Sequence, residues 1–163
     1  MSEEVLIFAA TQIASTSVYA CVIALVGLLL ACASHPRDAL LFVLTNVVVG
    51  LMVLVLKELF AIPRPAGARV PIDGYAFPSG HAASAFALLA AYYCYVRPHL
   101  PVTWGCMLLA VLTVLAVLVA YSRVWLVVHT YSQIIAGALL GLTVPLAAWY
   151  VSQRINRGRL SQS

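Results

Sequence analysis

Seven residues suited to handling a phosphate group lie at or near the ends of otherwise apolar stretches of the chain. They comprise three cations, two imidazoles, one hydroxyl and one glycine: Lys57, Arg64, Ser79, Gly80, His81, Arg123 and His129. Cations neutralise phosphoryl oxygens, and the free backbone N–H groups at a helix start add donors where the helix dipole is positive. One imidazole can attack phosphorus while a second protonates the leaving oxygen. The set therefore predicts phosphoryl transfer.

The acidic residues do not favour a metal-dependent reaction. Glu58 and Asp73 are isolated in the sequence, so no carboxylate cluster is expected to hold a divalent ion. We expect neither a metal nor another cofactor. A single charged residue near the end of a span is ordinarily an interface anchor, and Arg69 is interpreted as a solvated loop charge. The functional interpretation of the other residues depends on their convergence at one place.

The composition requires membrane helices to carry these residues. Of the 163 residues, 64% are hydrophobic and only 9% are charged, and the mean hydropathy is +1.03. Most of the uncharged stretches reach the roughly 20 residues that a helix needs to cross a bilayer. We predict an all-α, polytopic membrane helix bundle that forms one domain over residues 1–163. The net charge of +4 comes from basic residues scattered among loops, so no nucleic-acid partner is expected.

The breaks between apolar stretches predict five spans, near residues 17–33, 39–60, 78–95, 104–121 and 129–151. An interfacial helical segment is expected before them and a polar tail after them. Pro36 is interpreted as part of a turn, and Ser79 as the cap of the third span. Because successive links between spans alternate between membrane faces, the seven residues share one face.

The remaining basic residues predict the orientation of the spans. With Lys57, Arg64 and Arg123 set aside, only Arg69 lies on the face of the candidate site. Five basic residues lie on the opposite face: Arg37, Arg97, Arg154, Arg157 and Arg159. The positive-inside rule then places the candidate site outside the cytoplasm and the C-terminus within it. In a bacterium this membrane would be the inner membrane.

Three segments resemble the signatures of the type 2 phosphatidic acid phosphatase superfamily: residues 57–65 (KELFAIPRP), 78–81 (PSGH) and 122–133 (SRVWLVVHTYSQ). The resemblance implies a metal-independent hydrolase in which His129 forms a phosphohistidine and His81 is the general acid. It also implies a lipid phosphate or diphosphate as substrate, held in the membrane. The residues that it implies bind the phosphoryl group are Lys57, Arg64, Ser79, Gly80 and Arg123. The twelve residues between Pro65 and Pro78 are too few for a lid domain, so the site should open sideways toward lipid.

Gln133 departs from the usual pattern of this superfamily, which commonly has aspartate four residues after the nucleophile. Its amide can accept a hydrogen bond from Nδ1–H of His129 and so leave Nε2 free, but it supplies no negative charge. Two interpretations follow: a catalytically silent lipid-phosphate-binding pseudoenzyme, or a subgroup of enzymes that works with glutamine.

The residues around the two histidines bear on the substrate. Residues 129–133 (HTYSQ) resemble the corresponding segment of dolichyl diphosphatases, which favours the second interpretation of Gln133. We therefore expect hydrolysis of a polyprenyl diphosphate to the monophosphate and inorganic phosphate. Residues 78–84 (PSGHAAS) resemble the general bacterial form of the superfamily instead. A phosphatidic acid or phosphatidylglycerophosphate substrate is the alternative.

Overall fold

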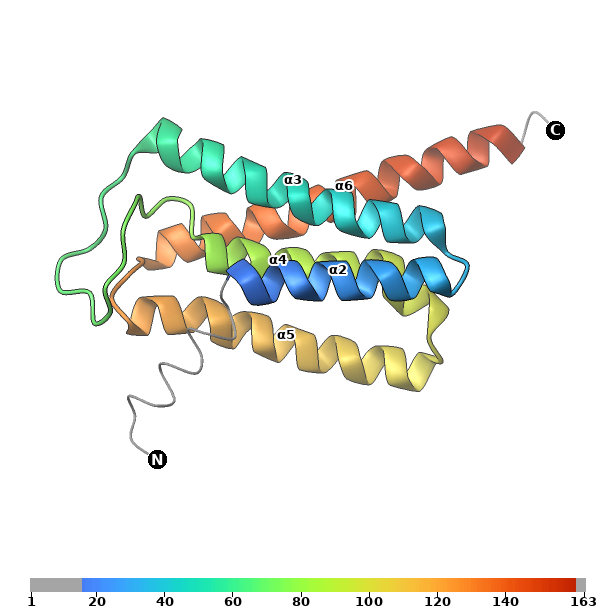
Figure 1. Cartoon of the computed structure of the whole chain (residues 1–163), viewed down its shortest axis with the longest axis horizontal. Helices are drawn as coiled ribbons and strands as arrows, with labels where there is room; N and C mark the ends of the chain where they lie inside the picture. The colour runs from blue at the N-terminus through green and yellow to red at the C-terminus, as the bar shows by residue number, and fades with distance from the viewer. Residues whose placement is uncertain (1–15, 161–163) are drawn as a thin grey trace.

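The structure, a computed structural model, describes residues 16–160, and over these residues the chain is a bundle of helices (Figure 1). The long helices are α2 (Thr16–Cys32), α3 (Pro36–Phe60), α4 (Gly80–Ala91), α5 (Val102–Trp125) and α6 (Tyr131–Leu160). A π-helical turn, Tyr92–Val96, and a 3-10 turn, Arg97–His99, extend α4. The predicted all-α class is confirmed. The interfacial segment predicted before the first span lies outside the described residues.

The helices have the length and composition of a multi-pass membrane protein. Among the described residues, α3, α5 and α6 are long and apolar enough to span a bilayer, and α2 is a shorter apolar helix. α4 and its π-helical turn add 12 and 5 residues, and at 1.5 Å per residue they cover about 26 Å of the hydrocarbon thickness. Large aliphatic side chains such as Leu54 and Leu118 are more than half exposed on the outer surface of the bundle. That surface suits contact with lipid.

Small residues bring α4 and α6 into close backbone contact. A Cβ atom at Gly137 would collide with the backbone oxygen of Ser79, and one at Gly141 would collide with that of Ala83. Glycines spaced four residues apart allow two helix backbones to approach closely within a membrane. The contact holds the start of α6 against the start of α4.

Several helix boundaries differ from the predicted spans. α3 begins at Pro36, because the first position of a helix needs no backbone N–H and tolerates proline. The predicted turn is therefore shorter than expected. α6 begins at Tyr131, two residues after His129, and continues to Leu160. The tail predicted after residue 151 is helical over the described residues, since positions 152–157 contain neither proline nor glycine.

The candidate residues converge on one end of the bundle, as the alternation of spans predicts. α3 and α5 end there, α4 and α6 begin there, and the loop between α3 and α4 covers it (Figure 1). The short links after α2 and α4 lie at the opposite end, where Nε2 of His99 lies within hydrogen-bond distance, 2.8 Å, of Oδ2 of Asp38.

Candidate active site

A cleft of about 420 Å³ lies at the end of the bundle where the candidate residues converge. Five of the residues predicted for the site line it: Lys57, Arg64, Gly80, His81 and His129. The lining continues along α3 with aliphatic side chains and includes Tyr19 of α2 and Ser84 of α4. None of these described lining residues carries a carboxylate. The cleft therefore joins a cationic, imidazole-containing end to an apolar wall.

His129 lies between a cation and an amide. Its Nε2 atom is 3.4 Å from Nη1 of Arg64, and its Nδ1 atom is 3.2 Å from Oε1 of Gln133. Because a guanidinium only donates, Nε2 must accept, and the ring proton must be on Nδ1. The backbone N–H of Thr130 donates to the same Oε1 atom at 3.0 Å, which fixes the orientation of the amide. The Nε2 lone pair is therefore directed at the guanidinium of Arg64, which lines the same cleft.

Gln133 also caps the helix that follows His129. Thr130 directly precedes the first residue of α6, and Gln133 is the third residue of that helix. A glutamine in this position that bonds back to the N–H of the capping residue forms one half of a capping box. The contact with His129 therefore spans a helix start rather than a turn of continuous helix. One amide oxygen serves both α6 and the imidazole.

Burial keeps His129 neutral. Its side chain is only 4% exposed, and this burial, together with the charge of Arg64, lowers the pKa of His129 to about 4. The neutral form is then complete at physiological pH and is lost only as the pH falls through about 4. Since the neutral imidazole is the nucleophilic form, His129 is ready to attack without first losing a proton.

Arg64 is positioned by backbone carbonyls of two loops. Its Nε donates to Gly74 O at 3.0 Å, its Nη2 to Asp73 O at 3.0 Å, and its Nη1 to Val128 O at 3.3 Å. Burial lowers the pKa of Arg64, but a guanidinium stays charged at any physiological pH. Lys57 is held in a similar way, by a bond to the carbonyl of Tyr75. The loop after α3 thus orients two cations through its main chain.

Ser79 and Arg123, the other two residues predicted for phosphate binding, are buried and are not among the residues that line the cleft. They are 0% and 1% exposed, and the Oγ atom of Ser79 and the Nη2 atom of Arg123 have no hydrogen-bond partner within residues 16–160. Ser79 occupies the capping position of α4, but the predicted side-chain cap bond is not formed. Its backbone N–H instead donates to Gln133 O at 3.1 Å. An unsatisfied buried donor costs about 1–3 kcal/mol, and an anion bound beside both groups would satisfy them.

Arg69 has a structural role that its sequence position did not reveal. It is exposed, as predicted, but its backbone N–H donates to Leu126 O at 3.0 Å, and its guanidinium lies 4.6 Å from the ring centre of Trp125. These contacts fasten the loop after α3 to the turn that precedes His129. A contact made by an irregular loop has no periodicity that a sequence pattern could indicate.

Comparison with known proteins assigns the class that this fold and cleft indicate. Residues 38–157 match the family described as the PAP2 superfamily, and the chain belongs to that superfamily. A crystal structure of a PAP2 type phosphatidylglycerolphosphate phosphatase from Bacillus subtilis superposes with a TM-score of 0.84 at 27% sequence identity. The superposition covers 95% of this chain and 80% of that one.

Individual relatives resemble part of the chain. Dolichyldiphosphatase 1 of Rhinolophus ferrumequinum is 32% identical over 111 residues, which are 61% of this chain and 47% of that protein. The human dolichyldiphosphatase 1 is 32% identical over 107 residues, or 59% and 44% of the two chains. This chain spans about half the length of the curated relatives it matches.

Proposed function

We propose that this protein hydrolyses a polyprenyl diphosphate to the polyprenyl phosphate and inorganic phosphate through a phosphohistidine at His129. The observation that carries the proposal is the pairing of His129 with Arg64 on one nitrogen and Gln133 on the other, within a cleft that also contains His81. An imidazole held as this tautomer, beside a cation that can neutralise phosphoryl oxygens, is an activated nucleophile for phosphorus.

The proposed reaction has two displacements. Nε2 of His129 attacks the terminal phosphorus, and the bond from phosphorus to the bridging oxygen breaks as the imidazolium form of His81 gives its proton to the leaving polyprenyl phosphate. Water then attacks the phosphohistidine while His81, now neutral, takes a proton from the water. The bond from phosphorus to Nε2 breaks, and inorganic phosphate is released. Lys57, Arg64 and Arg123 offset the phosphoryl charge, while Ser79 and the backbone N–H of Gly80 donate to the oxygens. The cations supply the charge stabilisation, so we propose no metal for this chemistry.

The substrate class follows from the leaving group and from the relatives. Without a carboxylate beside His129, the site suits a leaving group that departs easily, and a phosphate monoester is expelled more easily than a simple alkoxide. The similarity to dolichyldiphosphatase 1 agrees with a polyprenyl diphosphate. The structural similarity to the phosphatidylglycerolphosphate phosphatase of Bacillus subtilis favours a second candidate, a glycerolipid phosphate.

Substitutions at Gln133 test whether the glutamine supports turnover. We expect the wild-type protein to release phosphate from a long-chain prenyl diphosphate. Gln133→Ala should reduce kcat by at least about tenfold, because the imidazole loses the acceptor that fixes its tautomer. Gln133→Glu, which keeps the reach of the side chain and its bond to Thr130, should retain activity. It should also move the acid limb of kcat/KM to higher pH, because a carboxylate stabilises the imidazolium and raises the pKa of His129.

The measurement is phosphate release by wild type, Gln133→Ala, Gln133→Glu and Gln133→Asp over a pH series, on a prenyl diphosphate, phosphatidic acid and phosphatidylglycerophosphate. Thermal unfolding of each variant checks that the cap of α6 survives. A silent wild type together with an active Gln133→Asp variant would show a pseudoenzyme. Faster turnover of either glycerolipid phosphate than of the prenyl diphosphate would select the second candidate.

We also propose that the cleft faces away from the cytoplasm. In a background lacking the four native cysteines, Ala68→Cys should react with an impermeant thiol reagent added outside intact cells, and Gly158→Cys should react only after lysis. The expectation rests on the excess of basic residues at the end of the bundle opposite the cleft. Labelling is read as a mass shift of the purified protein. The reverse pattern would place the cleft in the cytoplasm.

A further inference from the structure

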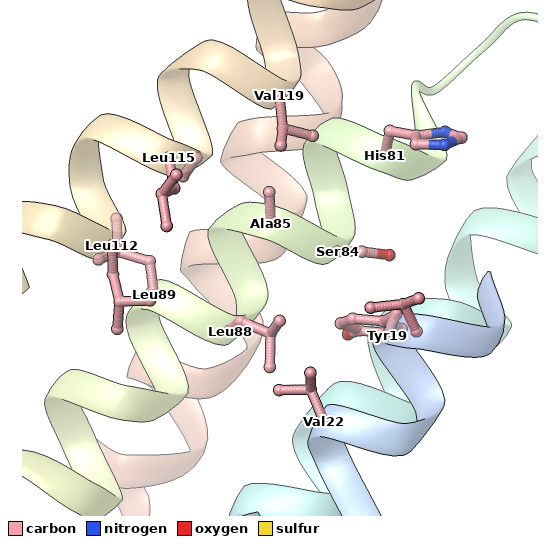
Figure 2. Close-up of a pocket in the computed structure, with 12 residues that line it drawn as sticks. Tyr19, Val22, His81, Ser84, Ala85, Leu88, Leu89, Leu112, Leu115 and Val119 are labelled. Atoms are coloured by element: carbon pink, nitrogen blue, oxygen red, sulfur yellow. The ribbon is translucent and has the colours of Figure 1, made fainter. Parts of the chain in front are cut away.

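A second cavity, of about 240 Å³, adjoins the cleft that contains His81 and His129. It shares Tyr19, His81 and Ser84 with that cleft, and its other lining residues are aliphatic. Figure 2 shows its three walls: α4 along the floor, α2 on one side with Tyr19 and Val22, and α5 on the other with Leu112 and Leu115. We call this cavity the α2–α5 groove.

The packing of the helices explains why the groove is open. α2 packs mainly against α3, whereas α4 packs against α3, α5 and α6. Within residues 16–160, neither the α2–α4 pair nor the α2–α5 pair is among the closely packed helix pairs. The face of α4 that carries Ser84, Ala85 and Leu88 therefore lies between two helices that do not close over it. From His81 to Leu88 the groove follows α4 for about 10 Å, at 1.5 Å per residue.

A hydrogen-bonded tyrosine marks the junction of the two cavities. The hydroxyl of Tyr19 donates to Oδ1 of Asn46 at 2.9 Å. Asn46 is fully buried and its amide nitrogen donates to Phe42 O at 2.7 Å. The orientation of the Asn46 side chain, which accepts from Tyr19, is therefore fixed. The side chain of Ser84 points from α4 toward Tyr19 (Figure 2). The polar lining thus ends at this level, and the groove beyond it is apolar.

The proposed reaction determines the direction in which the lipid tail extends from the phosphorus. In a displacement at phosphorus, the attacking and leaving atoms lie roughly in line on opposite sides. If His129 attacks and His81 protonates the leaving oxygen, the leaving group lies on the side of His81. The lipid is attached to that leaving group. It must therefore extend from His81 away from His129, which is where the α2–α5 groove begins.

We infer that the apolar tail of the lipid phosphate substrate binds in the α2–α5 groove, with its first segment between Ala85 of α4 and Val119 of α5. This inference rests on the proposed function. Because the tail arrives from lipid and not from water, its burial in the groove adds little affinity. The groove instead orients the bond that breaks, so its effect should appear in kcat/KM for substrates with a long tail.

A matched pair of substitutions on α5 tests the groove. Leu115→Trp should narrow it, whereas Leu118→Trp changes a residue of similar exposure, 57% against 50%, that does not line it. The measured quantity is the ratio of kcat/KM for a long prenyl diphosphate to that for a short one. This ratio should fall about tenfold or more in Leu115→Trp and stay at the wild-type value in Leu118→Trp. Ala85→Phe, which narrows the groove from α4, should reproduce the fall.

An unchanged ratio in both Leu115→Trp and Ala85→Phe would overturn the inference, as would an equal fall in Leu118→Trp. A groove occupied by residues 1–15 of the chain would give the first of these results. If the wild type hydrolyses phosphatidic acid and not prenyl diphosphates, the proposed substrate fails, and the same ratio is measured with long and short acyl chains.

A photoreactive probe tests the groove independently of turnover. A prenyl diphosphonate with a diazirine on its first isoprene unit should crosslink to α2 and α5, at residues such as Tyr19 and Val119. Crosslinks confined to α3 or α6 would overturn the inference even if the protein is catalytically silent.

Discussion

His129→Ala is expected to reduce phosphate release from the lipid substrate by more than about 10⁴-fold, because it removes the imidazole that forms the proposed covalent intermediate. The substitution removes a small buried ring and its bond to Gln133, while the contact between Gln133 and the backbone of Thr130 can persist. Insertion into the membrane and the helical fold should therefore survive. The measurement is phosphate release by the purified variant at matched concentration.

His129→Gln provides the control for this result. It keeps a polar side chain of similar size at the position but cannot form a phosphoryl intermediate on a ring nitrogen. Both variants should be equally inactive while circular dichroism and thermal unfolding remain close to wild type. Activity above a few per cent of wild type in either variant would assign the nucleophile to another residue.

His81→Ala is expected to slow the reaction by an amount that depends on the leaving group. For a lipid monoester, whose alkoxide needs a proton as it departs, the loss should be about 10²- to 10⁴-fold. For an aryl phosphate with an acidic phenol the loss should be much smaller, and a prenyl diphosphate should lie between the two. The measurement is kcat/KM for the three substrates in wild type and variant, plotted against the pKa of the leaving group.

Equal losses on all three substrates would remove the general-acid role and leave His81 as a positioning or charged residue. Ser84→Ala is a suitable companion because Ser84 lies one turn along α4 and lines the same cleft, while its hydroxyl is not a general acid at neutral pH. A leaving-group dependence in Ser84→Ala as steep as in His81→Ala would show that the effect arises from disturbance of α4.

The convergence of the cleft residues could be predicted because it depends only on the alternation of spans. Once the chain crosses the membrane after Lys57, returns before Arg123 and crosses again after His129, these residues must share one face. No contact geometry is needed for this step. The structure places Lys57 and His129 in one cleft, as the prediction requires.

The groups that orient the cations could not be predicted. Arg64 is held by the carbonyls of Asp73, Gly74 and Val128. Every residue has a backbone carbonyl, so the residue types do not indicate which carbonyls will accept these hydrogen bonds. The loop that supplies two of them is irregular, so it has no period from which a register could be inferred. The same limit applies to Arg69 and its contact with Trp125.

The contact between Gln133 and His129 was predicted correctly, but the reason given for it was incomplete. The spacing from His129 predicts that the two side chains meet, as residues four apart do on one face of a helix. The helix in fact begins at Tyr131, and the side chains meet across its capped start. A threonine followed three residues later by glutamine is a readable capping signal, so this feature was accessible from residues 130–133.

The stereochemical course at phosphorus tests the central claim most directly. A prenyl diphosphate whose terminal phosphorus carries sulfur and two different oxygen isotopes is hydrolysed by the wild-type protein in water labelled with the third oxygen isotope, and the configuration of the released thiophosphate is determined. Two in-line displacements, first by His129 and then by water, each invert the phosphorus. A phosphohistidine mechanism therefore predicts net retention of configuration. Net inversion would mean that water attacks the substrate directly, and it would contradict the assignment of His129 as a nucleophile.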